Sequence, residues 1–188
     1  TFYEESGRWY IRASSYDELI TWYQNLEQNY SNYLWVFNAT QRYGTDVIPD
    51  SDYGLYITRI TNESISGSKP EVLISLTIHG NERIGADGGY WFTDWLMRHA
   101  FHPDYDCPER EWLQWLVDNR EIYLVCCLNP DGFDEYHRGN DWGLDMNRDF
   151  GHSRTNAWTA SNTETVRHFV NNHTVPTAVD LHTGIYGI

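Results

Sequence analysis

The fold is decided by residues 72–101, VLISLTIHGNERIGADGGYWFTDWLMRHAF. The first part, Val72 to Ile78, is a nearly continuous apolar run, which is typical of a strand covered on both faces of a sheet. Apolar residues then recur at helical spacing from Gly85 to Phe101. The stretch therefore predicts a strand, a loop over residues 79–84 and a helix, a unit that is typical of α/β domains.

The rest of the chain continues this alternation of strands and helices. Ser15 and Glu18 form a capping box before a periodic apolar stretch, which predicts a helix over about residues 16–30. Further helices are expected over residues 111–119 and 162–170, and further strands over residues 34–39, 54–60, 121–128 and 177–181. We expect an α/β fold with a mixed, largely parallel, doubly wound sheet and helices on both faces. Sites in such folds lie beyond the carboxyl ends of the strands.

Length and composition indicate one packed domain over residues 1–188. The chain is 40% hydrophobic and long enough to close one sizeable core. Its formal net charge of −14 argues against nucleic acid as a partner, since proteins that bind the phosphate backbone concentrate Lys and Arg. No apolar run approaches the roughly 18 residues that would span a bilayer. We therefore expect neither a nucleic-acid partner nor a membrane span.

Two further signals concern the cellular compartment. Acceptor tripeptides for N-glycosylation, which fit a secreted extracellular glycoprotein, occur at Asn29, Asn38, Asn62 and Asn172. The three cysteines, Cys107, Cys126 and Cys127, allow at most one disulfide within the chain and lack the spacing of a thiolate zinc site. We interpret the cysteines as structural residues.

Polar side chains gather where two of the expected strands end. His79 and Glu82 are three residues apart in the loop after the strand 72–78, close enough for an imidazole nitrogen and a carboxylate to meet one cation. His182 ends the strand 177–181 and should bring a third donor to the same edge of the sheet. Two imidazoles and one carboxylate leave zinc an open position that can activate water. A His-x-x-Glu pair alone is common, so a role without a metal stays open for these residues.

Four segments together resemble one enzyme family. They are IHGNERIG, LNPDGFDEYHRGNDWGLDMNRDF, SNTET and VDLHTG, and they are similar, in the same order, to the zinc metallocarboxypeptidases of the funnelin, carboxypeptidase A/B-like type. The resemblance implies one Zn²⁺ held by His79, Glu82 and His182. It also implies that a peptide or protein C-terminus is the substrate, and that metal-activated water removes its last residue.

The resemblance gives roles to four residues of the central segment. Asn147 and Arg148 stand where the family binds the substrate carboxylate, which a guanidinium can grip bidentately. Arg138 matches the arginine that polarises the scissile carbonyl and stabilises the oxyanion. Asp145 is similar to the acid that accepts the spare N–H of the first zinc histidine, here His79. Taken singly, each arginine is more typical of surface ion pairing in so acidic a chain, and the metal motif reverses that preference.

The resemblance also draws attention to what the chain lacks. The family's catalytic base is a glutamate well beyond the third ligand, and only six residues, none of them acidic, follow His182. We expect residues 1–188 to form a zinc carboxypeptidase-like catalytic domain that is truncated after the third ligand. A missing C-terminal segment or a companion chain would supply the base. The NPDG segment at residues 129–132 is interpreted as a structural turn without chemistry.

Two other functions share part of this pattern. The aspartoacylase and succinylglutamate-desuccinylase group also carries HGNE and a DLNR-like segment, and it cleaves amides of N-acyl amino acids. The third hypothesis is a zinc-binding or self-assembling structural protein that keeps the fold without catalysis. The NPDG turn followed by an arginine, and the SNTET helix start, favour the peptidases over the deacylases.

Overall fold

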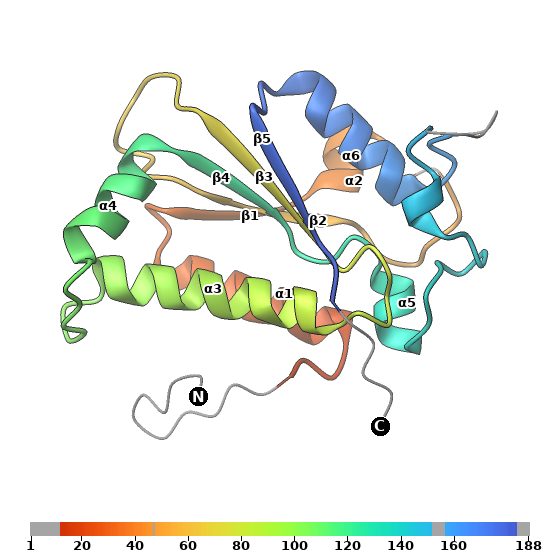
Figure 1. The fold of residues 1–188 in the computed structure, drawn as a ribbon, viewed down its shortest axis with the longest axis horizontal. Helices are drawn as coiled ribbons and strands as arrows, with labels where there is room; N and C mark the ends of the chain where they lie inside the picture. Colours follow the sequence, from red (N-terminus) through yellow and green to blue (C-terminus); the bar gives the residue numbers. More distant parts are fainter. Residues whose placement is uncertain (1–11, 47, 152–156, 184–188) are drawn as a thin grey trace.

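The computed structural model describes residues 12–46, 48–151 and 157–183, which form one sheet with helices on both faces (Figure 1). The strands are β1 Leu34–Asn38, β2 Tyr56–Ile60, β3 Glu71–Leu76, β4 Glu121–Val125 and β5 Thr177–Leu181. The helices are α1 Tyr16–Asn29, α2 Ala39–Tyr43, α3 Ile84–Phe101, α4 Arg110–Asn119, α5 Pro130–Glu135, the 3₁₀-helix η1 Met146–Arg148 and α6 Ser161–Asn172.

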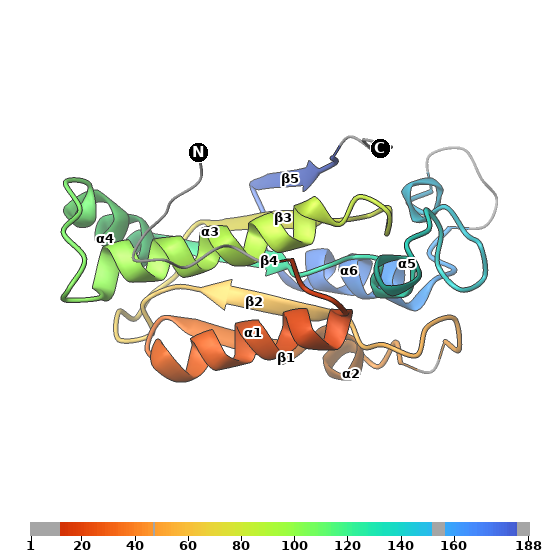
Figure 2. The same cartoon turned by 90° about the horizontal axis from the view of Figure 1, so that it is seen from below.

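The sheet has the strand order β1-β2-β4-β3-β5, which Figure 2 shows from β1 at the bottom to β5 at the top. The strand β3 pairs in parallel with both β4 and β5, whereas β2 pairs antiparallel with β1 and with β4. The expected mixed sheet with helices on both faces is confirmed. Its parallel half is the half that contains the strand 72–78 from which the fold was inferred.

Both faces of the sheet carry a hydrophobic core. On one face, Leu96 of α3 and Leu113 of α4 pack with Leu124 of β4. On the other face, Phe169 of α6 packs with Tyr123, the neighbour of Leu124 along the same strand. Successive residues of β4 thus enter opposite cores, as the near-continuous apolar runs of the buried strands predict.

The structure contains the helix cap that the sequence predicts. Ser15 accepts a hydrogen bond from the backbone N–H of Glu18 at the start of α1. The expected strand 34–39 ends one residue early, because Asn38 caps the short helix α2 instead. The expected strand 72–78 also ends early, at Leu76, because Thr77 adopts a left-handed conformation with φ +57°. This turn begins the loop that carries His79 and Glu82.

The strand β5 differs from the other four. Within the described residues it pairs only with β3, and every one of its five residues is exposed. Val179 and Leu181 each leave 44% of their surface accessible. An exposed edge strand with apolar side chains presents unpaired backbone groups with which another strand can pair.

The remaining expectations concern cysteines and membranes. All three cysteines are buried and free, as expected of structural residues, and burial raises the pKa of the Cys126 thiol to about 12. The described helices include none that is both long and apolar enough to cross a membrane.

Candidate active site

The three predicted metal ligands converge at the carboxyl ends of β3 and β5. One donor atom from each of His79, Glu82 and His182 lies within 4.8 Å of the other two. The Nδ1 atom of His79 lies 2.8 Å from one carboxylate oxygen of Glu82, and the Nδ1 atom of His182 lies 3.1 Å from the other. The structure thus brings together residues that are up to 103 positions apart, around one point.

The second nitrogen of each imidazole faces a further carboxylate. The Nε2 atom of His79 lies 3.3 Å from Asp145, and the Nε2 atom of His182 lies 3.2 Å from Asp180. Such partners orient the two imidazole rings, so that both Nδ1 atoms face Glu82. Two Nδ1 atoms and a carboxylate form the donor set of a catalytic zinc site, so these residues fit the ion that the resemblance implies.

Glu82 is held ionised although it is buried. Burial by itself would raise the pKa of this carboxyl, but the hydrogen bond from His79 and the N–H of Thr183 outweigh it, and so the pKa lies below its usual value. An anionic carboxylate between two imidazoles attracts a divalent cation. Thr183 was not singled out in the sequence, because its contact with Glu82 spans 101 residues.

Close backbone packing fixes the loop that carries His79 and Glu82. A Cβ atom on Gly80 would lie 1.9 Å from the carbonyl carbon of Gly132, so only glycine fits between this loop and α5. The hydroxyl of Thr77 accepts the N–H of Ala86 at 2.9 Å and thereby ties the strand end to α3. The metal loop is therefore set by backbone contact rather than by its own side chains.

Arg138 and Asp145 form an ion pair next to His79. The Nε and Nη2 atoms of Arg138 donate to one oxygen of Asp145 at 3.1 and 2.9 Å. Burial would raise the pKa of Asp145, but this pairing keeps it below its usual value. Asp145 thus joins the expected oxyanion residue to the expected metal ligand.

Residues 129–132 were expected to form a structural turn, and this expectation was wrong, because they begin a helix. The segment begins the helix α5, with Asn129 as its N-cap and Pro130 in the first turn. The amide of Asn129 also donates to the backbone carbonyls of Arg138 and Gly139 at 3.0 and 2.9 Å. Asn129 therefore positions Arg138. The Asn-Pro pair is a helix-start signal that could have revealed the helix, though not the contact.

Asn147 and Arg148 lie on η1, directly after Asp145. Asp145 caps this 3₁₀-helix and Met146 anchors it in the core under the sheet. Arg148 is exposed and forms no ion pair with any residue that the structure describes, and its guanidinium makes a single hydrogen bond among those residues, to the carbonyl of Asn147. The guanidinium is thus available to an external anion.

A residue that sequence reasoning missed holds this segment in place. The carboxylate of Asp149, which is 1% exposed, accepts hydrogen bonds from the N–H groups of Thr159 and Ala160 and from the Thr163 hydroxyl. These partners precede and begin α6. Asp149 therefore fixes Arg148 to the start of α6, and only its adjacency to Arg148 could have pointed to it.

Known proteins resemble this chain in sequence and in fold. Residues 19–183 match the sequence profile of the zinc carboxypeptidase family. A stretch of 95 residues, 44% of this chain and 19% of the relative, is 30% identical to carboxypeptidase E of Caenorhabditis elegans. Among solved structures, thrombin-activatable fibrinolysis inhibitor superposes with a TM-score of 0.71 at 16% identity, covering 90% of this chain and 47% of that one.

A carboxypeptidase A-like protein of Shewanella denitrificans superposes with a TM-score of 0.67 at 19% identity, over 93% of this chain and 41% of that one. At these identities the structural matches show the fold alone. The chain spans less than half the length of these related structures. The profile match covers most of the chain, and the chain belongs to the zinc carboxypeptidase family.

Proposed function

We propose that this chain forms the zinc-binding and carboxylate-binding part of a carboxypeptidase that removes C-terminal residues from peptides. One observation carries the proposal. The donor cluster of His79, Glu82 and His182 is linked through Asp145 to Arg138, and Arg148, which has no ion pair within the described ranges, follows on η1. A cation site next to an available guanidinium suits a substrate that ends in a carboxylate.

Each residue has a distinct task in this proposal. His79, Glu82 and His182 would hold a zinc ion, which when bound supplies a Lewis acid beside the scissile bond. Arg148 binds the terminal carboxylate bidentately and Asn147 adds an amide donor. Arg138, oriented by Asp145, donates to the oxygen of the scissile carbonyl as negative charge develops there.

Matched ligands test the assignment of Arg148. We expect zinc-loaded chain to bind a hippuryl-type peptide with a free C-terminus, and Arg148→Ala to weaken this binding about 10- to 100-fold, the range for a hydrogen bond to a charged group. The same peptide amidated at its C-terminus should be almost unaffected. Arg42→Ala, at an exposed arginine on α2, is the control and should change neither affinity.

Two outcomes, one in the binding measurements and one in a cleavage assay, would contradict the assignment. Equal losses for the free and the amidated peptide would show that Arg148 is structural. Tight binding and cleavage of an N-acyl aspartate, with no response to the hippuryl peptide, would show that the site serves a deacylase.

We also propose that the general base comes from a further C-terminal segment or a companion chain, so that the domain formed by residues 1–188 is incomplete. Among the described residues, the acids around the donor cluster are already engaged: Glu82 with both histidines, Asp145 with Arg138, and Asp180 with His182. The open edge and exposed side chains of β5 offer a place for added chain.

Kinetic assays test this second proposal. Residues 1–188 alone should hydrolyse a hippuryl peptide about 10²- to 10⁴-fold more slowly than a form that includes the added segment, the range typical of a general base. Full activity of residues 1–188 alone would refute it.

Secretion is a further proposal, supported by acceptor tripeptides at the exposed residues Asn29 and Asn172. Asn38 should stay unmodified, because its side chain caps α2 and packs against Gly54. Site-resolved mass spectrometry of chain secreted from a eukaryotic cell would check this. A glycan at Asn38 would contradict the capping role of that side chain, and the absence of glycans at Asn29 and Asn172 would contradict the proposal of secretion.

A further inference from the structure

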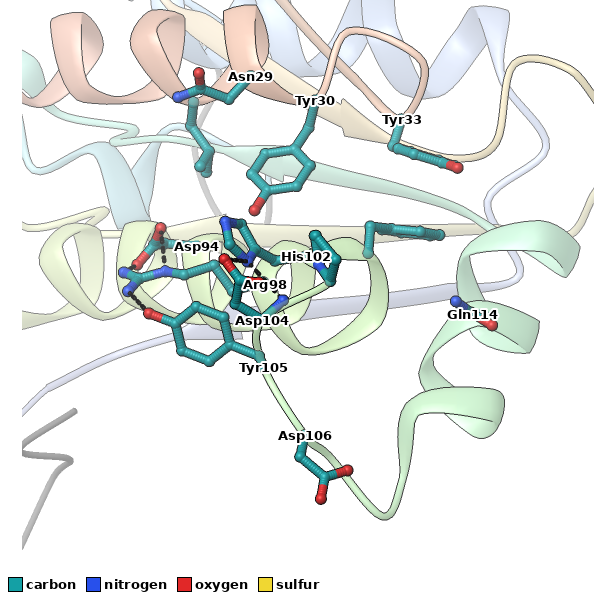
Figure 3. A pocket seen from close by; sticks show the side chains of 13 residues that line it. Asn29, Tyr30, Tyr33, Asp94, Arg98, His102, Asp104, Tyr105, Asp106 and Gln114 are labelled. Atoms are coloured by element: carbon teal, nitrogen blue, oxygen red, sulfur yellow. Dashed lines mark hydrogen bonds and ion pairs between the residues drawn. The ribbon is translucent and has the colours of Figure 1, made fainter. Parts of the chain in front are cut away.

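An open cavity of about 1240 Å³, drawn in Figure 3, lies around the C-terminal end of α3, whereas the candidate metal site lies at its N-terminal end. The metal loop precedes the first residue of α3, whereas the cavity lies around its last turns. Eighteen residues of helix place the two sites on the order of 27 Å apart. The end of α1, the second half of α3 and the loop after α3 line the cavity. It is therefore a separate site.

Aromatic side chains form much of the cavity wall. The rings of Tyr33 and Phe101 stack at a centroid distance of 3.7 Å, and the ring of Tyr105 packs edge-on against His102. Tyr30 points its hydroxyl into the cavity, toward His102 (Figure 3). That hydroxyl has no hydrogen-bond partner in the described part of the chain. Burial raises the pKa of Tyr30, so the hydroxyl is neutral at neutral pH.

Arg98, the single arginine among the residues that line the cavity, already has hydrogen-bond and ion-pair partners. Arg98 forms a bidentate ion pair with Asp94, and its Nη1 atom donates to the hydroxyl of Tyr105 at 3.1 Å. The Nδ1 atom of His102 accepts the N–H of Asp104 at 3.2 Å. Both side chains therefore already have partners within the chain.

Two carboxylates give the cavity a surplus of negative charge. The side chain of Asp104 is 86% exposed, and one of its carboxylate oxygens lies 4.0 Å from the Nδ1 atom of His102. Asp106 is exposed and makes no ion pair within the described ranges. The net charge of −14 on the whole chain adds a field that attracts cations.

We propose that this cavity binds an organic cation, an ammonium or guanidinium group with apolar substituents. Aromatic faces attract cations through their quadrupole, and the apolar substituents of such a group are buried against the same rings. Asp104 and Asp106 supply the opposite charge at the rim. The cation is carried either by a small molecule or by a basic side chain of a peptide, since both present the same chemistry.

A pair of probes of equal shape isolates the contribution of charge. Choline and its uncharged carbon isostere, 3,3-dimethyl-1-butanol, are titrated separately into the 188-residue chain by calorimetry or by NMR. We expect choline to bind at least about tenfold more tightly, within the range of partly desolvated cation–π contacts. Equal affinities, or no binding of choline at millimolar concentration, would overturn the proposal. N-acetyl-arginine amide distinguishes the two sources: tighter binding than choline indicates a peptide-borne cation, and weaker binding a small molecule.

Variants locate the binding to this cavity. Asp104→Asn, at an exposed residue, should weaken choline binding about threefold or more, while Asp17→Asn at the far end of α1 should not. Tyr30→Leu should abolish the preference for choline over its isostere, and Tyr30→Phe should retain it. Tyr30→Leu also removes packing and could prevent folding. In that case Asp104→Asn, at an exposed residue, still tests the proposal. If the affinity for choline is unchanged in both Asp104→Asn and Tyr30→Leu, choline does not bind in this cavity and the proposal is refuted. Retention of choline binding in His79→Ala is also required, since the metal site is not involved.

Discussion

The two histidines of the candidate metal centre stand on differently built parts of the sheet. His79 follows β3, which has a neighbour on each side, and its side chain is 3% exposed. His182 follows the edge strand β5, and its side chain is 41% exposed. One half of the site is thus preorganised by packing, whereas the other half depends on contacts with Glu82. We infer that the β3 half decides whether the chain folds. The β5 half should gain more stability than the β3 half when a ligand binds.

The largest effect should come from adding one methyl group to the β3 half. Gly80→Ala places a Cβ atom 1.9 Å from the backbone of Gly132, which cannot move without displacing α5. We expect a loss of roughly 3–5 kcal/mol in the free energy of unfolding, the range of severe core disruptions. Urea unfolding followed by circular dichroism measures it.

Gly88→Ala is the matched control for this substitution. Gly88 lies in α3, where a Cβ atom would meet nothing within 4 Å. Alanine favours helix over glycine, so this variant should gain about 0.5–1 kcal/mol. If both variants change stability by the same amount and in the same direction, the close backbone approach does not govern the β3 half.

A buried acid behind the same loop should make stability depend on pH. Burial raises the pKa of Asp131 to about 7, helped by the charges of Asp141 and Asp50, and one of its carboxylate oxygens has no hydrogen-bond partner among the described residues. The fold therefore favours the protonated carboxyl. The stability that it contributes is complete below the pKa of the unfolded chain, about 4, and is lost as the pH rises through about 7.

Asp131→Asn removes this titration. Between pH 5 and pH 8.5 the original chain should lose on the order of 2–4 kcal/mol relative to the variant. Asp46→Asn, at an exposed residue, is the control and should follow the original chain. Parallel pH profiles for the original chain and Asp131→Asn would show that the Asp131 carboxyl ionises freely in the folded protein.

The smallest predicted effect concerns the same substitution on two strands. Val125 of β4 is fully buried, and Val125→Thr should cost about 1–3 kcal/mol because it buries a hydroxyl. Val179 of β5 is 44% exposed, and Val179→Thr should change stability by less than about 0.5 kcal/mol. Comparable losses in the two variants would show that β5 is covered in solution, for example by a second copy of the chain.

The same contrast separates what the sequence predicts from what it does not. His79 and Glu82 follow a continuous apolar run, and His182 ends another strand, so strand-end reasoning predicts that the three residues meet. That β5 lies exposed at the edge was not predicted, because the pattern of a strand does not say whether a neighbour is present. The strand boundary at Leu76 also depends on one left-handed residue, Thr77, which is an unusual choice for that conformation.

The sequence alone did not predict the residues that act through contacts with distant parts of the chain. Asn129 holds the backbone of Arg138 and Asp149 holds the start of α6, and neither contact follows a helical or strand period. The cavity at the end of α3 is assembled from side chains of α1 and α3 that lie far apart in the sequence, such as Asn29 and Arg98. Periodicity predicts each helix but not the space between them.

Zinc content measured by elemental analysis tests the central claim most directly. The 188-residue chain, refolded with zinc and freed of excess metal, should hold one zinc per chain, and His79→Ala and His182→Ala should each hold almost none. His168→Ala, which removes a surface partner of Glu164, should leave the content at one. A content near zero in the unmodified chain, or an unchanged content in both ligand variants, would contradict the assignment of His79, Glu82 and His182 as the metal centre.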